Sequence, residues 1–283
     1  MSEKPASAVP LPYADRPIAT APGHWVLARA GKRVLRPGGA ALTADMLDHA
    51  RLAGADVVEL APGLGRTAAE IVAAGPASYT AIDRDPRAAA RVAAVVGTGG
   101  VVRQGEAADT GLDEECADVV VGEAMLTMQG DKSKAAIVAE AARVLRPGGR
   151  YAIHELGVAF DDIAEEDDTR LRRDLARAIH VNARPMTAAA WRALMEDAGL
   201  EVDWVKTAPM ALLKMSRNLK DEGLGGSLRI LWNVLRDKGL RARVMEMRSV
   251  FTRYEKDMVG IALVAHKPEA GARTAPEEAA PGA

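Results

Sequence analysis

The chain has 283 residues, 48% of them hydrophobic and 27% charged, which is typical of a folded globular protein. Its net charge of −2 and isoelectric point near 6.3 give the whole molecule no field that would collect nucleic acid or a membrane surface. Cys116 is the only cysteine, so an internal disulfide and a cysteine-built zinc site are excluded and a cytoplasmic location is expected. No apolar run reaches the roughly 18 residues of a membrane span.

The two ends of the chain differ from its middle. Residues 1–22 are rich in Pro and Ala without periodicity, and residues 268–283 are rich in Ala, Pro and Glu, so both ends are expected to be disordered. One folded domain is expected over residues 23–267. It should begin with a short helix over residues 24–31, followed by a helix that Thr43 caps.

From Asp56 onward, apolar runs alternate with helical patterns. The runs DVVELA, YTAIDR, GVVRQG, DVVVGEA and RYAIHEL are short and β-branched, as expected of strands buried on both faces of a parallel sheet. A sixth strand over residues 201–207 and a last strand VGIALVAHK complete the set. The sequence therefore predicts an α/β fold with a doubly wound, mostly parallel, seven-stranded sheet, which binds ligands outside the carboxyl ends of its strands.

The stretch VVELAPGLGRT, residues 57–67, is the expected centre of the ligand site. Gly63 and Gly65 permit a tight turn between strand and helix and a close approach of a ligand to the backbone. Asp83 ends the next strand, about 20 residues on, where an acid meets the ribose of a bound nucleotide. The loop lacks the G-x-G-x-x-G spacing of dinucleotide-binding proteins.

Four pieces of the chain, taken in order, resemble class I S-adenosylmethionine-dependent methyltransferases. They are ELAPGLG, AIDRDP, VVRQGEAAD and the pair ADVVVGEAML and ARVLRPGGRYAIHEL. The most similar group includes quinone-biosynthesis C-methyltransferases and many small-molecule methyltransferases. One departure is visible, because Ala61 stands where the family loop E/D-x-G-x-G-x-G has its first Gly. The resemblance implies S-adenosyl-L-methionine as cofactor, S-adenosyl-L-homocysteine as product, and a cofactor site made of Glu59, Ala61, Gly63, Gly65, Asp83, Arg84, Glu106, Ala107 and Glu123.

The general base is sought at the end of the fifth strand. His154 and Glu155 lie there in sequence, and one of their side chains should point into the cleft, where a neutral imidazole could take a proton from a hydroxyl. His180, ahead of a later helix, is a second candidate, and a structural His–Glu pair remains the alternative. The five histidines show no metal-binding spacing, so no metal is expected.

Residues 208–258 form an insertion between the last two strands. Three stretches show apolar residues at helical spacing, and from Lys214 to Asp257 there are eleven Lys or Arg against six Asp or Glu. Three helices are therefore expected. They form either a lid over an apolar or anionic acceptor or a packing element that holds a homodimer together, and the sequence leaves both interpretations open.

The sequence thus predicts methyl transfer to a small-molecule acceptor of apolar or amphiphilic character, without nucleic acid as a partner. Two alternatives stay open. The chain could bind S-adenosylmethionine without catalysis, because its cofactor residues are better defined than its base. An NAD(P)-dependent oxidoreductase would use a similar fold, but the loop spacing disfavours it.

Overall fold

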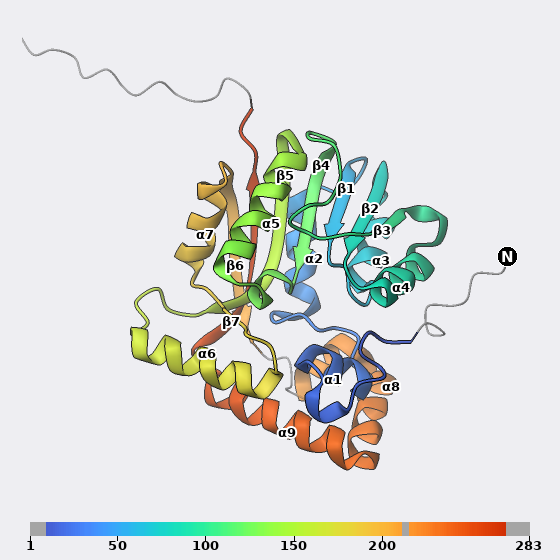
Figure 1. Cartoon of the computed structure of the whole chain (residues 1–283), viewed down its shortest axis with the longest axis vertical. Coiled ribbons are helices and arrows are strands. Elements are labelled where there is room, and N and C mark those ends of the chain that lie inside the picture. The colour runs from blue at the N-terminus through green and yellow to red at the C-terminus, as the bar shows by residue number, and fades with distance from the viewer. Residues whose placement is uncertain (1–9, 211–214, 270–283) are drawn as a thin grey trace, which may run out of the picture.

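The computed structural model of the chain describes residues 10–210 and 215–269 (Figure 1). The sheet has seven strands in the order β3-β2-β1-β4-β5-β7-β6. Their bounds are Asp56–Leu60 for β1, Ser78–Asp83 for β2, Val101–Gln104 for β3, Ala117–Glu123 for β4, Leu145–Val158 for β5, Glu201–Pro209 for β6 and Met258–His266 for β7. Strands β1 to β5 are parallel, while β7 runs antiparallel to both β5 and β6. The predicted mostly parallel, seven-stranded α/β sheet is confirmed.

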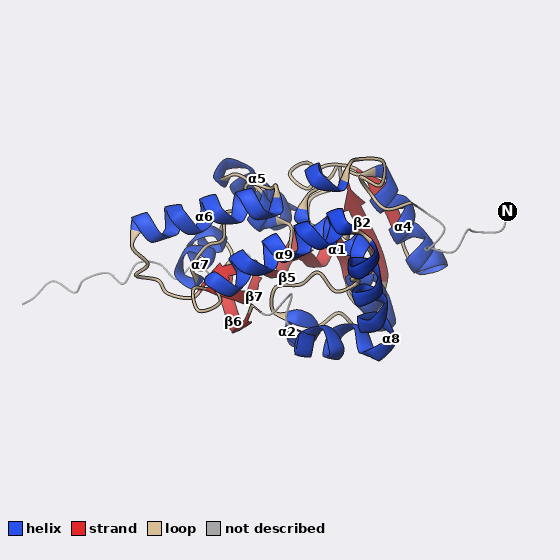
Figure 2. Cartoon of the chain, turned by 90° about the horizontal axis from the view of Figure 1, so that it is seen from below, coloured by secondary structure: helices blue, strands red, loops and turns tan. Residues whose placement is uncertain are grey.

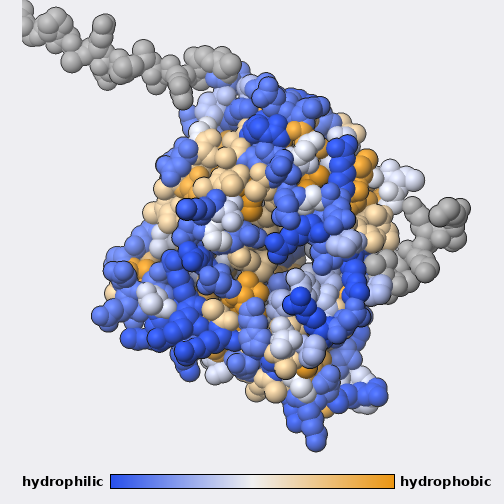
Figure 3. All heavy atoms as spheres, viewed as in Figure 1, coloured by the Kyte–Doolittle hydropathy of each residue, from blue (hydrophilic) through white to orange (hydrophobic). Residues whose placement is uncertain are grey.

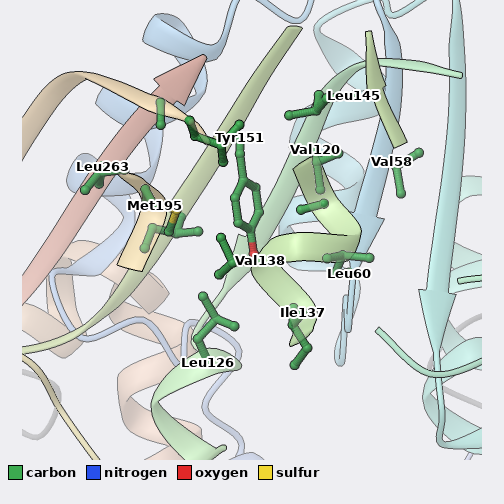
Figure 4. Close-up of a cluster of buried hydrophobic side chains, with 14 of the residues drawn as sticks. Val58, Leu60, Val120, Leu126, Ile137, Val138, Leu145, Tyr151, Met195 and Leu263 are labelled. Atoms are coloured by element: carbon green, nitrogen blue, oxygen red, sulfur yellow. The ribbon is translucent and has the colours of Figure 1, made fainter. Parts of the chain in front are cut away.

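Helices cover both faces of the sheet (Figure 2). On one face lie α2 (Gly39–Ala50), α3 (Arg66–Ala73) and α4 (Pro86–Val96), which pack Leu42, Ile71 and Val92 onto the strands. On the other face, α5 (Asp131–Val144) and α7 (Ala188–Asp197) contribute Val138 and Met195 to a second buried cluster (Figure 4). Burial of strands on both faces explains why their sequences are nearly continuous apolar runs.

Within this second cluster, Tyr151 of β5 points toward Val138 of α5 (Figure 4). A Cβ at Gly122 of β4 would lie 3.2 Å from the Tyr151 hydroxyl, so a side chain there would crowd the ring. Glycine at this point of β4 therefore makes room for a large aromatic ring in the core.

The remaining helices gather at the carboxyl ends of the parallel strands (Figure 1). They are α1 (Gly23–Ala30), α6 (Glu165–Ile179), α8 (Met215–Arg236) and α9 (Lys238–Arg253). Leu27, Ala178 and Met247 join α1, α6 and α9 in a third apolar cluster. Short 3-10 turns lie at Ile18–Thr20, Gly97–Gly99 and Leu126–Met128.

The insertion is helical, as the sequence predicts. Gly223, with φ of 71° and ψ of 179°, interrupts α8, so that α8 and α9 together give three helical segments; residues 211–214 lie outside the described range. In the part of the chain that the structure describes, no helix is both long and apolar enough to cross a membrane.

Two sequence expectations about the start of the chain are wrong. Residues 10–22 were expected to be disordered, but Arg29 of α1 donates hydrogen bonds to the carbonyl oxygens of Tyr13 and Arg16, and Ala21 is fully buried. Residues 1–9 and 270–283 lie outside the described range. Thr43 does not cap a helix either, because α2 begins four residues earlier and Gly38 occupies the N-cap position.

Candidate active site

A cavity of about 690 Å³ lies between the carboxyl ends of the strands and the helices α1, α6 and α9. This volume falls in the range of about 300–1,000 Å³ that is usual for small-molecule sites. On the face shown in Figure 3, apolar residues lie in the middle, where the sheet meets the lower helices, with hydrophilic residues around them. Of the nine predicted cofactor residues, eight line the cavity: Glu59, Ala61, Gly63, Asp83, Arg84, Glu106, Ala107 and Glu123.

The turn after β1 brings backbone to the cavity wall. Ala61 and Gly63 both have positive φ, at 52° and 56°, and the Ala61 amide donates to the Ile82 carbonyl of β2. A Cβ at Gly63 would meet only the Ala61 carbonyl oxygen, at 3.9 Å, so space for a ligand lies beside this backbone. Gly65 does not line the cavity, because its missing side chain instead lets α3 approach Val95 of α4.

Asp83 ends β2 with its carboxylate at the cavity wall. One oxygen accepts the Gly63 amide at 3.2 Å and the other accepts the Asp85 amide at 2.9 Å. Burial raises the pKa of this carboxyl, and the two backbone donors oppose the rise. A carboxylate has about four acceptor positions, so two remain for the hydroxyl groups of a ligand.

Glu59 is buried at the end of β1, and its carboxyl accepts the Tyr79 hydroxyl at 2.5 Å. Burial raises its pKa from the ordinary 4.5 to about 8, and the nearby Glu123 carboxylate adds to the rise. Glu59 is therefore protonated near neutral pH and can donate a hydrogen bond.

Glu123, at the end of β4, is held by the Arg36 guanidinium and by two hydroxyl groups. One oxygen pairs with the Arg36 Nε at 3.0 Å and accepts the Thr67 hydroxyl, while the other accepts the Thr43 hydroxyl. Burial acts to raise the pKa of this carboxyl, but Arg36 and His154 outweigh it and hold the pKa at about 2. Glu123 is ionised and already paired, which leaves little of it for a ligand.

His154 is buried on the α2 face of β5 and does not line the cavity. Its Nε2 accepts the Gly38 amide at 3.0 Å, so the ring proton lies on Nδ1, 2.8 Å from Glu123 Oε1. With both nitrogens bonded inside the protein, the predicted role of His154 as a base has no geometric support.

Glu155 points to the opposite face and lines the cavity, as expected of one member of the pair. One of its oxygens accepts the amides of Met125 and Leu126, and the other accepts the amide and hydroxyl of Thr127, at 2.7–3.0 Å. All four acceptor positions of the carboxylate are therefore filled. Burial raises the pKa of this carboxyl, and these hydrogen bonds oppose the rise. Glu155 fixes the turn after β4 and has no free position for a substrate proton.

Two histidines line the cavity, His180 and His24. His180 follows α6 with φ of 53°, at the predicted position by the cleft. His24 is not among the site residues predicted from the sequence. Burial lowers the pKa of His24 to about 4, so its imidazole is neutral at physiological pH.

The wall opposite Asp83 is apolar and comes from several separate segments. It combines side chains of α1, β5, α6, α9 and the residue after β6, among them Trp25, Leu156, Leu175, Ile179, Met210, Met247 and Phe251. The Met-rich insertion predicted part of this wall, while nothing in the local pattern indicated Trp25. Among the described residues, no three or more His, Cys, Asp or Glu side chains form a group able to hold a metal ion.

Residues 58–153 match the sequence family described as "Methyltransferase domain". This segment is similar to methyltransferase domains. The match agrees with the resemblance to class I S-adenosylmethionine-dependent methyltransferases, and the matched segment holds the cavity residues from Glu59 to Glu123.

Other proteins are similar to this chain in sequence or in fold. A Haemophilus influenzae protein described as uncharacterized is 28% identical over 251 residues, covering 87% of this chain and 98% of its own length. An N-methyltransferase of Haemonchus contortus, solved with phosphomonomethylethanolamine and S-adenosylhomocysteine, has a TM-score of 0.66 at 13% identity, over 87% of this chain and 58% of that chain. The [4+2]-cyclase SpnF has a TM-score of 0.64 at 16% identity, over 92% and 99%. At such identities the solved structures show the fold alone.

Proposed function

We propose that this protein transfers a methyl group from S-adenosylmethionine to a small acceptor of apolar or amphiphilic character. The observation that carries the proposal is the Asp83 carboxylate, held by two backbone amides at the wall of a cavity whose far side is apolar. The similarity of the segment around Asp83 to methyltransferase domains supports the same reaction.

The residues present fit the proposed cofactor. Asp83 has two acceptor positions for ribose hydroxyls, and the backbone beside Gly63 leaves open space. Arg84, Glu106 and Ala107 lie along the same wall, where the adenine would be held. The bound cofactor would supply an activated methyl group, so the protein's own task is to align the acceptor and exclude water.

The apolar wall supports the proposed acceptor class. Leu175, Ile179, Met247 and Phe251 offer no charged group, and methionine side chains adapt to irregular apolar shapes. Removing water from such a wall favours an acceptor with apolar surface by about 25 cal/mol per Å² buried. His24 and His180 are the imidazoles at the cavity that could take a proton from an acceptor hydroxyl.

Replacement of Asp83 tests the proposal. We expect Asp83→Ala to weaken binding of S-adenosylhomocysteine at least about tenfold, because two hydrogen bonds to a charged acceptor are lost. The measurement is isothermal titration calorimetry with the purified protein. Transfer of a labelled methyl group from S-adenosylmethionine to candidate acceptors should fall in parallel.

Asp113→Ala is the matched control, because Asp113 is an exposed aspartate in the loop after β3. It should bind S-adenosylhomocysteine as the parent does, and NAD should bind to neither protein. Tight binding of NAD with no binding of S-adenosylhomocysteine would overturn the proposed function. Unchanged affinity in Asp83→Ala would overturn the role of Asp83.

A further inference from the structure

The outer face of α8 carries a row of exposed apolar side chains, which we call the leucine stripe: Leu224, Leu228, Leu231, Trp232 and Leu235. They are exposed to 73%, 64%, 42%, 59% and 56%, respectively. At 100° per residue these positions fall within one sector of about 100° of the helix, the width of a buried face. Contiguous exposed apolar surface of this kind marks an interaction site more often than isolated exposed leucines do.

The opposite face of α8 makes the contacts that hold the helix in the fold. Ile230 and Val234 pack against the cluster of α1, α6 and α9. Asn233 donates to the Ala30 carbonyl at 3.0 Å, and Glu222 accepts the amides of Arg33 and Val34 at 2.7 and 2.8 Å. The leucine stripe is therefore not needed to fix α8 in the fold.

The surroundings of the leucine stripe are basic. Between Glu222 and Arg253, six Lys or Arg are exposed against two Asp or Glu, while Arg243 is buried. Of the six, Arg253 pairs with Asp174 and Arg229 also donates to the Gly31 carbonyl. Arg229 and Arg236 follow stripe residues directly along the helix, and the Arg236 guanidinium lies over the Trp232 ring at 5.5 Å. The net charge of −2 of the whole chain does not reveal this local excess of positive charge.

From these observations we infer that α8 docks on an anionic lipid bilayer, with the leucine stripe in the headgroup region and the basic residues at the lipid phosphates. A helix with Leu and Trp on one face and Arg or Lys beside them binds in the plane of such an interface. The segment after Gly223 spans about 20 Å, from 13 residues at 1.5 Å each, which suits a helix lying flat.

A second copy of the chain fits this face less well. A stable dimer usually buries about 20–30 residues on each side, whereas the leucine stripe offers five. Two identical faces would also bring Arg229 and Arg236 of both copies close together, at a cost in repulsion. Anionic lipid supplies the opposite charge instead.

Docking would place a wall of the cavity near the lipid, because Glu222 of α8 holds the backbone of Arg33, and Arg33 lines the cavity. An acceptor dissolved in the bilayer would then reach the site at the membrane surface. This consequence rests on the proposed function, while the docking itself does not and is measured without any methyl donor.

The test is flotation of the full-length protein with vesicles of phosphatidylcholine and phosphatidylglycerol, against vesicles of phosphatidylcholine alone. We expect binding to the anionic vesicles only, and weaker binding as salt is added. Trp232 fluorescence should shift to the blue on binding, because Trp232 is 59% exposed while Trp25 and Trp191 are buried and Trp204 is half-buried against His49. Trp232→Phe should lose most of this shift but keep binding.

Leu228→Glu with Leu231→Glu should lower the partition coefficient at least about tenfold, since apolar contact is lost and negative charge is added. Arg236→Glu with Arg241→Glu should weaken binding through charge alone. The control Val101→Glu replaces another exposed apolar residue, 52% exposed on the edge strand β3, and should bind as the parent does.

Circular dichroism and S-adenosylhomocysteine titration verify that each variant is folded. Failure of the parent to bind anionic vesicles at low salt would overturn the inference. Binding of the Leu228→Glu/Leu231→Glu variant to anionic vesicles as strong as that of the parent would also overturn it. A third contradicting outcome is a parent that is a dimer by light scattering and a variant that is a monomer, with neither protein binding vesicles.

Discussion

At the scale of single residues, Ala61 carries backbone strain at the centre of the site. Its φ of 52° lies in the left-handed region, which costs a residue with a Cβ about 1–2 kcal/mol. Ala61→Gly relieves this strain but increases the freedom of the unfolded chain, by about 0.4–1 kcal/mol. We therefore expect a net gain of about 0.5–1 kcal/mol in the free energy of unfolding, measured as a higher urea midpoint with an unchanged slope.

The control for this prediction is Ala69→Gly. Ala69 is exposed in α3, only eight residues along, and glycine in a helix interior should cost about 1 kcal/mol. If Ala61→Gly destabilises the protein as Ala69→Gly does, the alanine is not strained in solution.

Glu59 should make the stability of the fold depend on pH. Its carboxyl has a pKa of about 8 in the folded protein and 4.5 ordinarily, so between these pH values the unfolded chain releases a proton that the folded chain keeps. Glu59 therefore lowers the free energy of unfolding as pH rises from 4.5 to about 8, but His24, whose pKa falls from 6.5 to about 4 on folding, raises it up to pH 6.5. The fall due to Glu59 should be seen between pH 6.5 and about 8. Glu59→Gln should flatten this fall, as measured by urea unfolding across the interval.

Glu114→Gln, at an exposed position, should leave that pH dependence unchanged. Glu123 does not affect this measurement. Its pKa is lowered to about 2, so its contribution to the free energy of unfolding is lost only as pH falls below 4.5. A Glu59→Gln variant whose stability depends on pH between 6.5 and 8 just as the parent's does would refute the protonated state of Glu59.

The sequence predicted the place of Asp83. It did not predict that the polar atoms of His154 and Glu155 are hydrogen-bonded within the protein. Asp83 follows from spacing alone, since the end of a second parallel strand lies beside the first turn. Successive side chains of β5 point to opposite faces, so only one of the pair could reach the cavity. Which of their hydrogen-bond positions are filled depends on Gly38 and Thr127, from distant segments, and no local pattern encodes that.

At the scale of elements, His154 joins the segment before α2 to β4 and β5. Its ring bonds the Gly38 amide and the Glu123 carboxylate, and the Thr43 hydroxyl lies 3.0 Å from Nδ1. His154→Ala should lower the free energy of unfolding by about 2–4 kcal/mol, because it leaves a cavity and unpaired polar groups.

If methyl transfer is measured below the unfolding temperature, the pH profile of kcat should keep its shape in His154→Ala. A catalytic base would instead lose one ionisation from the profile. His49→Ala, at an exposed position of α2, serves as the control and should cost less stability. If His154→Ala is as stable as the parent and the pH profile of its kcat is altered, the prediction from sequence that His154 is a base is supported instead.

Most elements could be read from the sequence because their patterns are local. Thr187 caps α7 as predicted, accepting the Ala190 amide, and the strands follow their apolar runs. The N-terminal region was missed because its order comes from tertiary contact, with Arg29 of α1 bonding the backbone of Tyr13 and Arg16. Composition alone cannot register such contacts.

At the scale of the whole molecule, the cavity has two walls of different origin. The wall with Asp83 comes from the ends of β1, β2 and β3, between residues 59 and 107, whereas the apolar wall combines residues from Trp25 to Phe251. The first could be predicted from motifs in order. The second could not, because it exists only after α1, α6 and α9 have packed together.

The matched family segment ends at residue 153, before most of the apolar wall begins. Mutations that accumulate in α6, α9 or the N-terminal region can therefore reshape the chamber without touching the wall around Asp83. Divergent descendants of such a chain would keep the same recognisable signature while changing what they modify. Substitutions at Leu175, Ile179, Met247 and Phe251 would change the apolar wall directly.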